Sequence, residues 1–188
     1  QRANEALREL TPRKIIAMSR VKVICTTDDP ADDLRWHKLI REDKGFSCKV
    51  LPAFRPDKAI NIDKAGFKAY LEALGAASGI EVKDFHSLKR ALDQRLEFFV
   101  SMGCRAADHG LDFIPWEPDT DAAASFSKAL QGEKLSAREA EGYKTQVMLH
   151  LAKRYRGLGV VMQIHFGAVR NNNPRAFSSL GPDTGYDA

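Results

Sequence analysis

The chain has 188 residues, of which 44% are hydrophobic and 29% are charged, and this composition fits one globular domain with a sizeable core and excludes a disordered chain. No apolar run approaches the roughly 18 residues that span a bilayer, and the N-terminal stretch QRANEALREL lacks the apolar segment of a signal peptide, so we expect a cytoplasmic protein without a membrane partner. The net charge is +4, and basic residues are scattered among acidic ones, so nucleic acid is not an expected partner either.

The three cysteines are expected to be reduced thiols. Cys25, Cys48 and Cys104 are an odd number and lack the CxxC spacing of zinc sites, which argues against a disulfide framework or a zinc knuckle. Reduced thiols are typical of a reducing compartment such as the cytoplasm. Cys25 and Cys104 are both predicted to pack as small buried hydrophobic side chains.

The predicted elements alternate between short apolar strands and longer segments of helical period. This order is typical of β-α units around a parallel sheet. The chain contains neither a GxGxxG nor a GxxxxGK[ST] loop, so two architectures stay open, a doubly wound sheet and a (β/α)8 barrel. The four strands are expected at residues 21–27, 48–54, 104–111 and 160–166.

Capping residues predict the helices of the first half of the chain. One helix is expected from about Thr11, with a proline at its first position, and it leads into the first strand. After that strand, Asp29 can accept the free N–H groups of a first turn and Pro30 suits position N1, so a second helix is expected to begin there. The third helix can be capped by Asn61 or Asp63. It carries Phe67, Tyr70, Leu71 and Leu74 on one face and ends near Gly75 or Gly79.

Apolar side chains spaced three and four residues apart predict two longer helices in the second half of the chain. One ends at Gly103, just before the third strand, and the other runs from about Ser136 to Gly157. The segment 117–134, rich in Asp and Ala, is expected to form an excursion that can carry a short helix. The two apolar faces comprise Leu88, Ala91, Leu92, Leu96, Phe99 and Val100, and Tyr143, Val147, Leu151 and Tyr155.

Ionisable residues follow the strands at their carboxyl ends, where both candidate architectures bind ligands. These ends contain the strings TTDDP, AFRPD, ADHGLD and IHFGAVRNNN. His165 lies on one face of the last strand, whereas Ile164 and Phe166 lie on the opposite face, which is expected to contact helices. The same period places Arg55 and Asp108 on the polar side. Three ionisable groups, Arg55, Asp108 and His165, are therefore predicted to converge at one end of the sheet.

Each of these residues also has a structural interpretation. His165 alone can be a hydrogen-bonded structural histidine, a metal ligand or an acid-base group. The Arg55 guanidinium can bind a ligand carboxylate or simply pair with an exposed aspartate such as Asp57. His109 points to the face opposite Asp108, so it is expected to pack or to form a hydrogen bond elsewhere.

The loop after the last strand has two interpretations as well. Arg170 and the asparagines at 171–173 can form a plain polar turn that ends at Pro174, or they can line a site for a ligand with many hydroxyl groups. Asp28 and Asp29 are more typical of helix caps than of catalytic groups. The histidines at 37, 86 and 150 lie in helical patterns, where surface or packing roles are expected.

Four strings, in this order and at these spacings, resemble uronate isomerase (glucuronate isomerase), a member of the amidohydrolase superfamily of metal-dependent (β/α)8 barrels: VICTTDDPADDLRWH, VLPAFRPDKAINID, GCRAADHGLD and QIHFGAVRNNNPRAF. The resemblance covers nearly the whole chain from about residue 10. It implies an aldose–ketose isomerase of bacterial uronate catabolism that converts D-glucuronate to D-fructuronate and D-galacturonate to D-tagaturonate. Two other functions stay open, a related metal-dependent hydrolase and a non-catalytic domain that binds sugar acids or assembles with other subunits.

The resemblance also implies roles for four residues. His165 matches a family histidine that helps to hold the divalent metal, commonly zinc. Arg55 and Arg170 match arginines at the substrate site, where they would pair with the uronate carboxylate. Asp108 matches an acidic residue near the active site, and it is the catalytic candidate of this chain.

The family pattern has further parts that this sequence lacks. It includes an HxH pair of metal ligands on the first barrel strand, and the sequence contains no HxH. It also includes an aspartate, followed two residues later by an arginine, on the last strand. We therefore expect residues 1–188 to be the central part of a partial (β/α)8 barrel with about four parallel strands, without its N-terminal and C-terminal segments and with an incomplete metal site and no activity of its own. Uncovered strand edges favour association into oligomers or aggregates.

Overall fold

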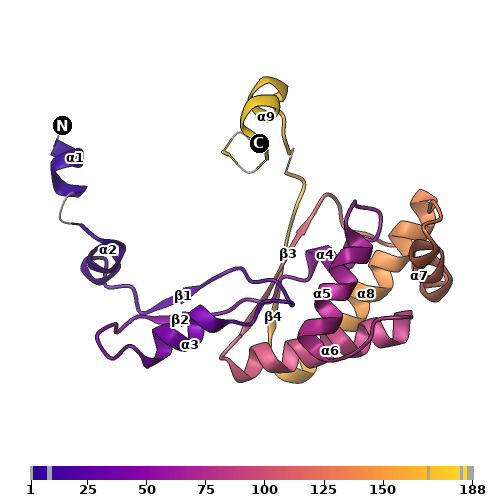
Figure 1. Ribbon diagram of the computed structural model, residues 1–188, viewed down its shortest axis with the longest axis horizontal. Helices are drawn as coiled ribbons and strands as arrows, with labels where there is room; N and C mark the ends of the chain where they lie inside the picture. Colours follow the sequence, from indigo (N-terminus) through magenta and orange to yellow (C-terminus); the bar gives the residue numbers. More distant parts are fainter. Residues whose placement is uncertain (1, 8–9, 169, 183, 186–188) are drawn as a thin grey trace.

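The computed structural model describes residues 2–7, 10–168, 170–182 and 184–185. Within these residues the strands are β1 (Val23–Cys25), β2 (Lys49–Leu51), β3 (Ala106–Leu111) and β4 (Val161–Phe166). β1 pairs with β2 and β3 pairs with β4, both in parallel. Phe54, shortly after β2, forms parallel bridges to Asp28 and Ala107, and these bridges join the two pairs. The strands therefore lie side by side in chain order (Figure 1), and each falls inside its predicted range.

The chain is thus an α/β protein in which helices connect parallel strands, as predicted. Two N-terminal helices precede β1 and extend away from the sheet (Figure 1), and the sequence patterns predict only the second of them. These helices are α1 (Arg2–Leu7) and α2 (Pro12–Met18). α2 begins at the predicted place, because the Thr11 side chain accepts a hydrogen bond from the N–H of Lys14 and a proline occupies its first position.

The helix after β1 begins later than predicted. α3 (Arg35–Glu42) starts well after Pro30. Asp29, Asp32 and Asp33 each accept a hydrogen bond from the N–H two residues further on, with N···O distances of 2.9, 2.6 and 3.0 Å. Such turns compete with helix formation and hold the segment as an irregular loop. The prediction of a helix that begins at Asp29 and Pro30 is therefore wrong.

Two helices follow β2, α4 (Asp57–Ile60) and α5 (Phe67–Ser78). The sequence patterns do not predict the short α4. Gly66 precedes α5 with a φ of 85° and without a side-chain cap, so the prediction that Asn61 or Asp63 caps this helix is wrong. Asp63 pairs instead with Lys144 at 2.7 Å. The predicted apolar face of α5 is buried, and Gly79 ends the helix in a left-handed conformation, as expected.

The remaining helices are α6 (Phe85–Ser101), α7 (Ala122–Gln131), α8 (Ala137–Leu158) and α9 (Pro174–Leu180). α6 and α8 confirm the two longer predicted helices, although α8 ends at Gly159 instead of Gly157. α8 begins with a capping box, in which Ser136 and Glu139 each accept the backbone N–H of the other. α7 lies within the predicted excursion at 117–134, whereas α9 is not predicted. None of the described helices is long and apolar enough to cross a membrane.

The hydrophobic core lies between the strands and helices α5, α6, α7 and α8, which gather together in Figure 1. Phe54 contacts Phe99 of α6 and Tyr155 of α8 edge to face, with ring centroids 5.2 and 6.3 Å apart. Aromatic pairs of this geometry contribute about 1 kcal/mol each beyond the area that they bury. These contacts fix the segment between β2 and α4 against helices α6 and α8, and so they also fix the position of the residues that follow Phe54.

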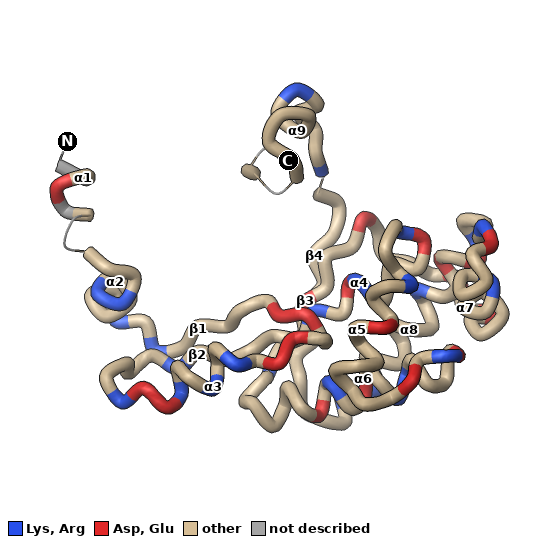
Figure 2. Tube along the Cα trace, in the orientation of Figure 1, with Lys and Arg blue, Asp and Glu red and all other residues tan. Residues whose placement is uncertain are grey.

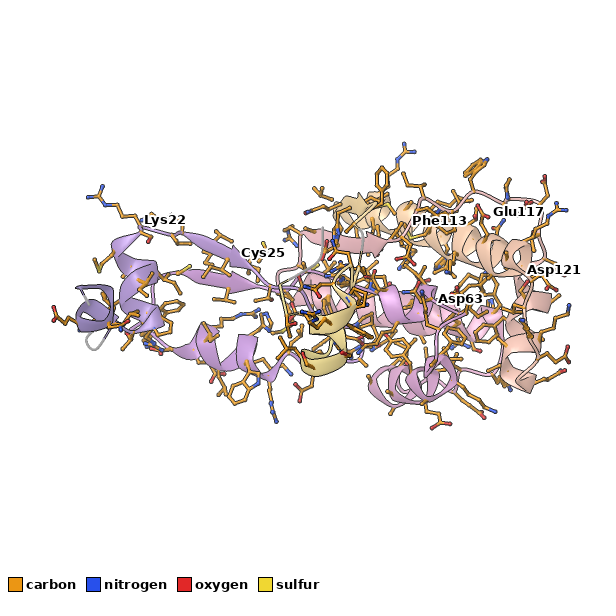
Figure 3. All side chains as sticks on the ribbon, turned by 90° about the horizontal axis from the view of Figure 1, so that it is seen from above. Lys22, Cys25, Asp63, Phe113, Glu117 and Asp121 are labelled. Carbon is orange, nitrogen blue, oxygen red and sulfur yellow. The ribbon has the colours of Figure 1, made fainter. Side chains whose placement is uncertain are left out.

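Two expectations about burial are wrong. Cys25, on β1 (Figure 3), is exposed, although Cys48 and Cys104 are buried and all three are free thiols. On the apolar face predicted for β4, Met162 packs against the core as expected, whereas Ile164 and Phe166 are 39% and 59% exposed. β1 and β4 are the edge strands, because each pairs with only one other strand within the described residues. The apolar surface along both edges therefore stays in contact with water.

Candidate functional site at the strand ends

The register of β3 and β4 brings the predicted site residues together. Asp108 pairs with Gln163 and Gly110 pairs with His165, so Asp108 and His165 lie on the same face of the sheet. Asp108 Oδ1 is 2.7 Å from His165 Nε2, and Asp108 Oδ2 is 3.3 Å from Arg55 Nη1. Acidic and basic segments meet where β1, β3 and α4 come together (Figure 2). The predicted convergence of Arg55, Asp108 and His165 is confirmed, and their chemical roles stay predictions.

Asp57, at the start of α4, is a fourth member of this group, and the sequence alone does not single it out as a site residue. Its Oδ2 accepts hydrogen bonds from Arg55 Nε at 2.8 Å and from the Gly110 N–H at 3.1 Å. The side chain of Asp57 is only 18% exposed. Burial raises the pKa of Asp57, and the hydrogen bond and charge of Arg55 act in the opposite direction. We call Arg55, Asp57, Asp108 and His165 the strand-end cluster.

Arg170 lies beside the strand-end cluster. Arg170 and His165 line one cavity of about 90 Å³, together with Gly110 and Asp112. The structure therefore brings all four predicted site residues to one region, three of them in the cluster and Arg170 next to it. Two guanidinium groups in one region can hold a carboxylate by parallel N–H···O hydrogen bonds.

The asparagine loop after β4 contains a turn and a helix cap. Asn171 has a φ of 53°, a left-handed conformation that asparagine adopts more readily than most residues. Asn173 Oδ1 accepts a hydrogen bond from the N–H of Ala176 at 3.0 Å and caps α9, with Pro174 at its first position. The interpretation as a polar turn that ends at Pro174 is therefore confirmed, while hydrogen bonding of the loop to a ligand stays a prediction.

The end of β1 carries a second polar group. The Thr26 hydroxyl donates a hydrogen bond to Asp28 Oδ2 at 2.6 Å and lies 2.8 Å from Nε2 of the buried His37. The backbone N–H of Arg55 donates a hydrogen bond to the backbone carbonyl oxygen of Asp28 at 2.9 Å, so this polar group adjoins the strand-end cluster. Asp28 thus stabilises the strand end instead of capping a helix. His37 has the packing role that the sequence predicts.

His109 points away from Asp108, as expected. Its side chain is fully buried, with the ring centroid 5.6 Å from that of Tyr155. Neither ring nitrogen has a hydrogen-bond partner among the described residues. Burial lowers the pKa of His109 to about 4, although the Asp108 carboxylate acts in the opposite direction. His109 is therefore an uncharged core residue at neutral pH.

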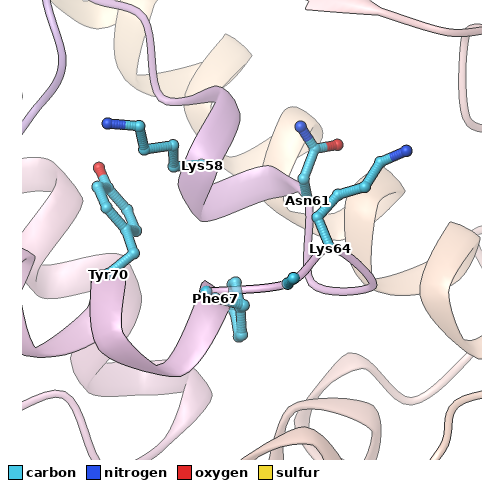
Figure 4. Close-up of a pocket in the computed structure, with 7 residues that line it drawn as sticks. Lys58, Asn61, Lys64, Phe67 and Tyr70 are labelled. Atoms are coloured by element: carbon cyan, nitrogen blue, oxygen red, sulfur yellow. The ribbon is translucent and has the colours of Figure 1, made fainter. Parts of the chain in front are cut away.

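Another pocket, of about 330 Å³, is lined by residues of α4, the following loop and α5 (Figure 4). Its lining includes Lys58 of α4, Asn61 and Lys64 of the following loop, and Phe67 and Tyr70 of α5. It contains no member of the cluster and no other predicted site residue. We place the candidate site at the cluster, because folds with parallel strands bind their ligands at the carboxyl ends of those strands.

Two side chains of the strand-end cluster are of types that bind metal ions. His165 Nε2 and an oxygen of Asp108 face each other, and both groups can bind a divalent cation. No group of three or more His, Cys, Asp or Glu within the described residues is arranged to hold a metal ion. Because catalytic zinc sites use about three protein ligands, these residues do not form a complete one.

The structure is that of an α/β protein with a cluster of ionisable side chains at the carboxyl ends of parallel strands. A family model described as glucuronate isomerase matches residues 1–188, so the chain belongs to the glucuronate isomerase family. The resemblance carried by the four sequence strings is thereby confirmed. The name of the family is that of an isomerase, so at the level of the family an enzyme is favoured over a non-catalytic domain that binds sugar acids or assembles with other subunits.

Relatives and solved structures agree with this assignment. The chain is 48% identical over 190 residues to the uronate isomerase of Caldicellulosiruptor saccharolyticus and 44% identical over 192 residues to that of Caldanaerobacter subterraneus, and each match covers 100% of this chain and 41% of the relative. The crystal structure of uronate isomerase from Thermotoga maritima matches with a TM-score of 0.90 and 35% identity, over 99% of this chain and 42% of that one. The chain thus spans about two fifths of the length of these relatives.

Proposed function

We propose that this chain is the central part of a uronate isomerase that converts D-glucuronate to D-fructuronate and D-galacturonate to D-tagaturonate. Family membership supports the reaction class, and the strand-end cluster supports the place of the reaction. Parallel strands in chain order fit one half of an eight-stranded (β/α)8 barrel, with residues 117–134 as an excursion from it. The other strands would come from N-terminal and C-terminal parts of a longer protein.

Arg55 and Arg170 are proposed to bind the carboxylate of the uronate. A guanidinium matches a carboxylate in shape and charge and binds it through two parallel hydrogen bonds. The Arg55 side chain is 29% exposed, so it is not fully buried. Fixing the carboxylate end of the substrate would restrict how the reacting carbons at its other end can lie relative to Asp108 and His165.

Asp108 is proposed to move a proton during the reaction. Isomerisation of an open-chain uronate transfers a proton from C2 to C1 and needs acid-base groups near both carbons. The Asp108 carboxylate lies between the His165 imidazole and the Arg55 guanidinium, where Oδ1 can hold or pass a proton. His165 is proposed as one ligand of a divalent metal, zinc, which would polarise the substrate carbonyl oxygen when bound. The described residues do not complete that metal site.

A cytoplasmic location and self-association complete the proposal. The free thiols of all three cysteines support a reducing compartment. The open edges of β1 and β4 support association of the chain with itself when no other segment covers them.

The contact of Arg55, Asp108 and His165 in one cluster is the observation that carries the proposal. The purified chain is expected to bind D-glucuronate weakly and in a salt-sensitive manner, because guanidinium groups attract the carboxylate. Isothermal titration at two salt concentrations measures this binding. Arg55→Met should reduce the affinity about tenfold, whereas Arg138→Met, at an exposed position of α8, should not. Equal binding by both variants would contradict the proposal.

Turnover provides a separate test. With zinc or manganese added, the 188-residue chain is expected to form no D-fructuronate, because one imidazole does not fix the geometry of a metal. If the chain alone turned over D-glucuronate, and His165→Ala abolished that turnover, the interpretation of this chain as the central part of a longer enzyme would be contradicted. In the longer protein, mass spectrometry distinguishes an isomerase, whose product keeps the mass of the substrate, from a related hydrolase, whose products do not.

A further inference from the structure

Asp57 connects the ends of two strands through one oxygen atom. It lies at the start of α4, and its Oδ2 accepts the Arg55 Nε–H at 2.8 Å and the Gly110 N–H of β3 at 3.1 Å. Gly110 in turn pairs with His165 of β4. Asp57 therefore fixes the Arg55 side chain relative to the strands that carry Asp108 and His165.

Gly110 forms the other half of this arrangement. A Cβ atom at this position would clash with Arg55 Nη2, and it would lie 3.2 Å from Asp57 Oδ2 and 3.0 Å from His165 Cε1. The guanidinium thus occupies the space that any larger residue at position 110 would need. Asp57 holds one edge of the guanidinium, and Gly110 leaves room for the other.

The second oxygen of Asp57, Oδ1, is buried and has no hydrogen-bond partner among the described residues. An unpartnered buried carboxylate oxygen destabilises the fold, so a purely structural position would favour a different side chain. The favourable contacts of Asp57 with charged groups are those with Arg55, which lower its pKa against the effect of burial. Residues that break such packing rules are typical of functional sites.

We infer that Asp57 is a positioning residue, which holds Arg55 by its Nε–H so that the Nη groups are presented to the carboxylate of the ligand. An arginine has five N–H donors, and Asp57 uses the single one on Nε. Nη1 lies 3.3 Å from Asp108, and the other Nη donors can bind a carboxylate side by side. A guanidinium that is held in advance loses less conformational entropy when the ligand binds. The ligand, a sugar acid, rests on the proposed function, whereas the positioning of Arg55 does not.

Hydrogen exchange at the Arg55 Nε–H measures this role directly. In the chain labelled with 15N-arginine, the Arg55 signal is identified by its loss in Arg55→Lys. Asp57→Ala is expected to raise the exchange rate about tenfold, because a charge-assisted hydrogen bond is removed. Asp57→Asn should stay within about threefold of the original rate, because its amide oxygen can still accept the Nε–H. Asp119→Asn, an exposed aspartate outside the strand-end cluster and outside the cavity beside it, is the control and should change nothing.

Titration with D-glucuronate gives the second readout for the same variants. Asp57→Ala is expected to weaken binding about tenfold, and Asp57→Asn to restore most of it. If the original chain binds no D-glucuronate while the Arg55 exchange responds as expected, the proposed function fails and the positioning role stands. If Arg55 exchanges at the same rate in Asp57→Ala and in the original chain, the inference is overturned.

Gly110→Ala covers the case in which Asp57→Ala does not fold. It leaves Asp57 in place but must displace Arg55 Nη2, because the added Cβ would clash with that atom. We expect a shifted Arg55 Nε–H signal and weaker binding of D-glucuronate. An unchanged Arg55 signal in this variant would overturn the inference as well.

Discussion

His109 makes the stability of this protein depend on pH in a defined direction. The side chain is fully buried beside Tyr155, and neither ring nitrogen has a hydrogen-bond partner among the described residues. Burial disfavours the charged imidazolium and lowers the pKa of His109 from its ordinary value of 6.5 to about 4. Between these two pH values, the unfolded chain binds a proton that the folded chain does not.

The contribution of His109 to stability is therefore complete above about pH 6.5 and falls as the pH drops toward 4. The two pKa values differ enough to destabilise the fold by about 3 kcal/mol once both states are protonated. At pH 5, which lies above the folded pKa, the expected loss relative to pH 8 is about 2 kcal/mol. This loss is large beside the 5–15 kcal/mol that are typical of the total stability of a domain.

Urea denaturation at pH 8 and pH 5 measures this effect in the original chain and in His109→Leu, which is apolar and cannot titrate. The carboxylates titrate in both proteins. Between pH 8 and pH 5, the free energy of unfolding of the original chain is therefore expected to fall by about 2 kcal/mol more than that of the variant. His86→Leu, at an exposed position near the start of α6, is the matched control and should follow the original chain. Equal losses in His109→Leu and in the original chain would refute the lowered pKa of His109.

Three further predictions concern stability and assembly. Arg95 donates hydrogen bonds to three backbone carbonyl oxygens, two in the loop after β1 and one in α5, so Arg95→Met should lower the free energy of unfolding by about 3 kcal/mol in urea denaturation. An equal loss in the exposed Arg90→Met would contradict this. Asn173→Ala removes the cap of α9 and should speed amide exchange at Ala176 about fivefold, and an unchanged rate would show that the cap is dispensable. Phe166→Lys, at an exposed position of β4, should reduce the self-association that light scattering measures. An original chain that is monomeric at every concentration would contradict this prediction.

Local signals in the sequence were sufficient for the strands and for several helix ends. Thr11 and Ser136 cap their helices by accepting N–H groups three residues further along the chain, and Gly79 ends α5 in a left-handed conformation. These interactions lie within one helical turn, so neighbouring residues decide them. The common face of Asp108 and His165 likewise follows from the two-residue period of a strand.

Other features were decided only by the tertiary structure. The loop before α3 contains local aspartate turns, but its attachment to the rest of the fold depends on Arg95, which donates to it from 63 and 65 residues away. Asp57 enters the site because its carboxylate meets the N–H of Gly110, 53 residues further along the chain. The exposure of Cys25 and Phe166 depends on what covers the edges of the sheet, and not on their own hydrophobicity. Residues so far apart meet only when the chain packs, and patterns that span a single helical turn or strand carry no information about those contacts.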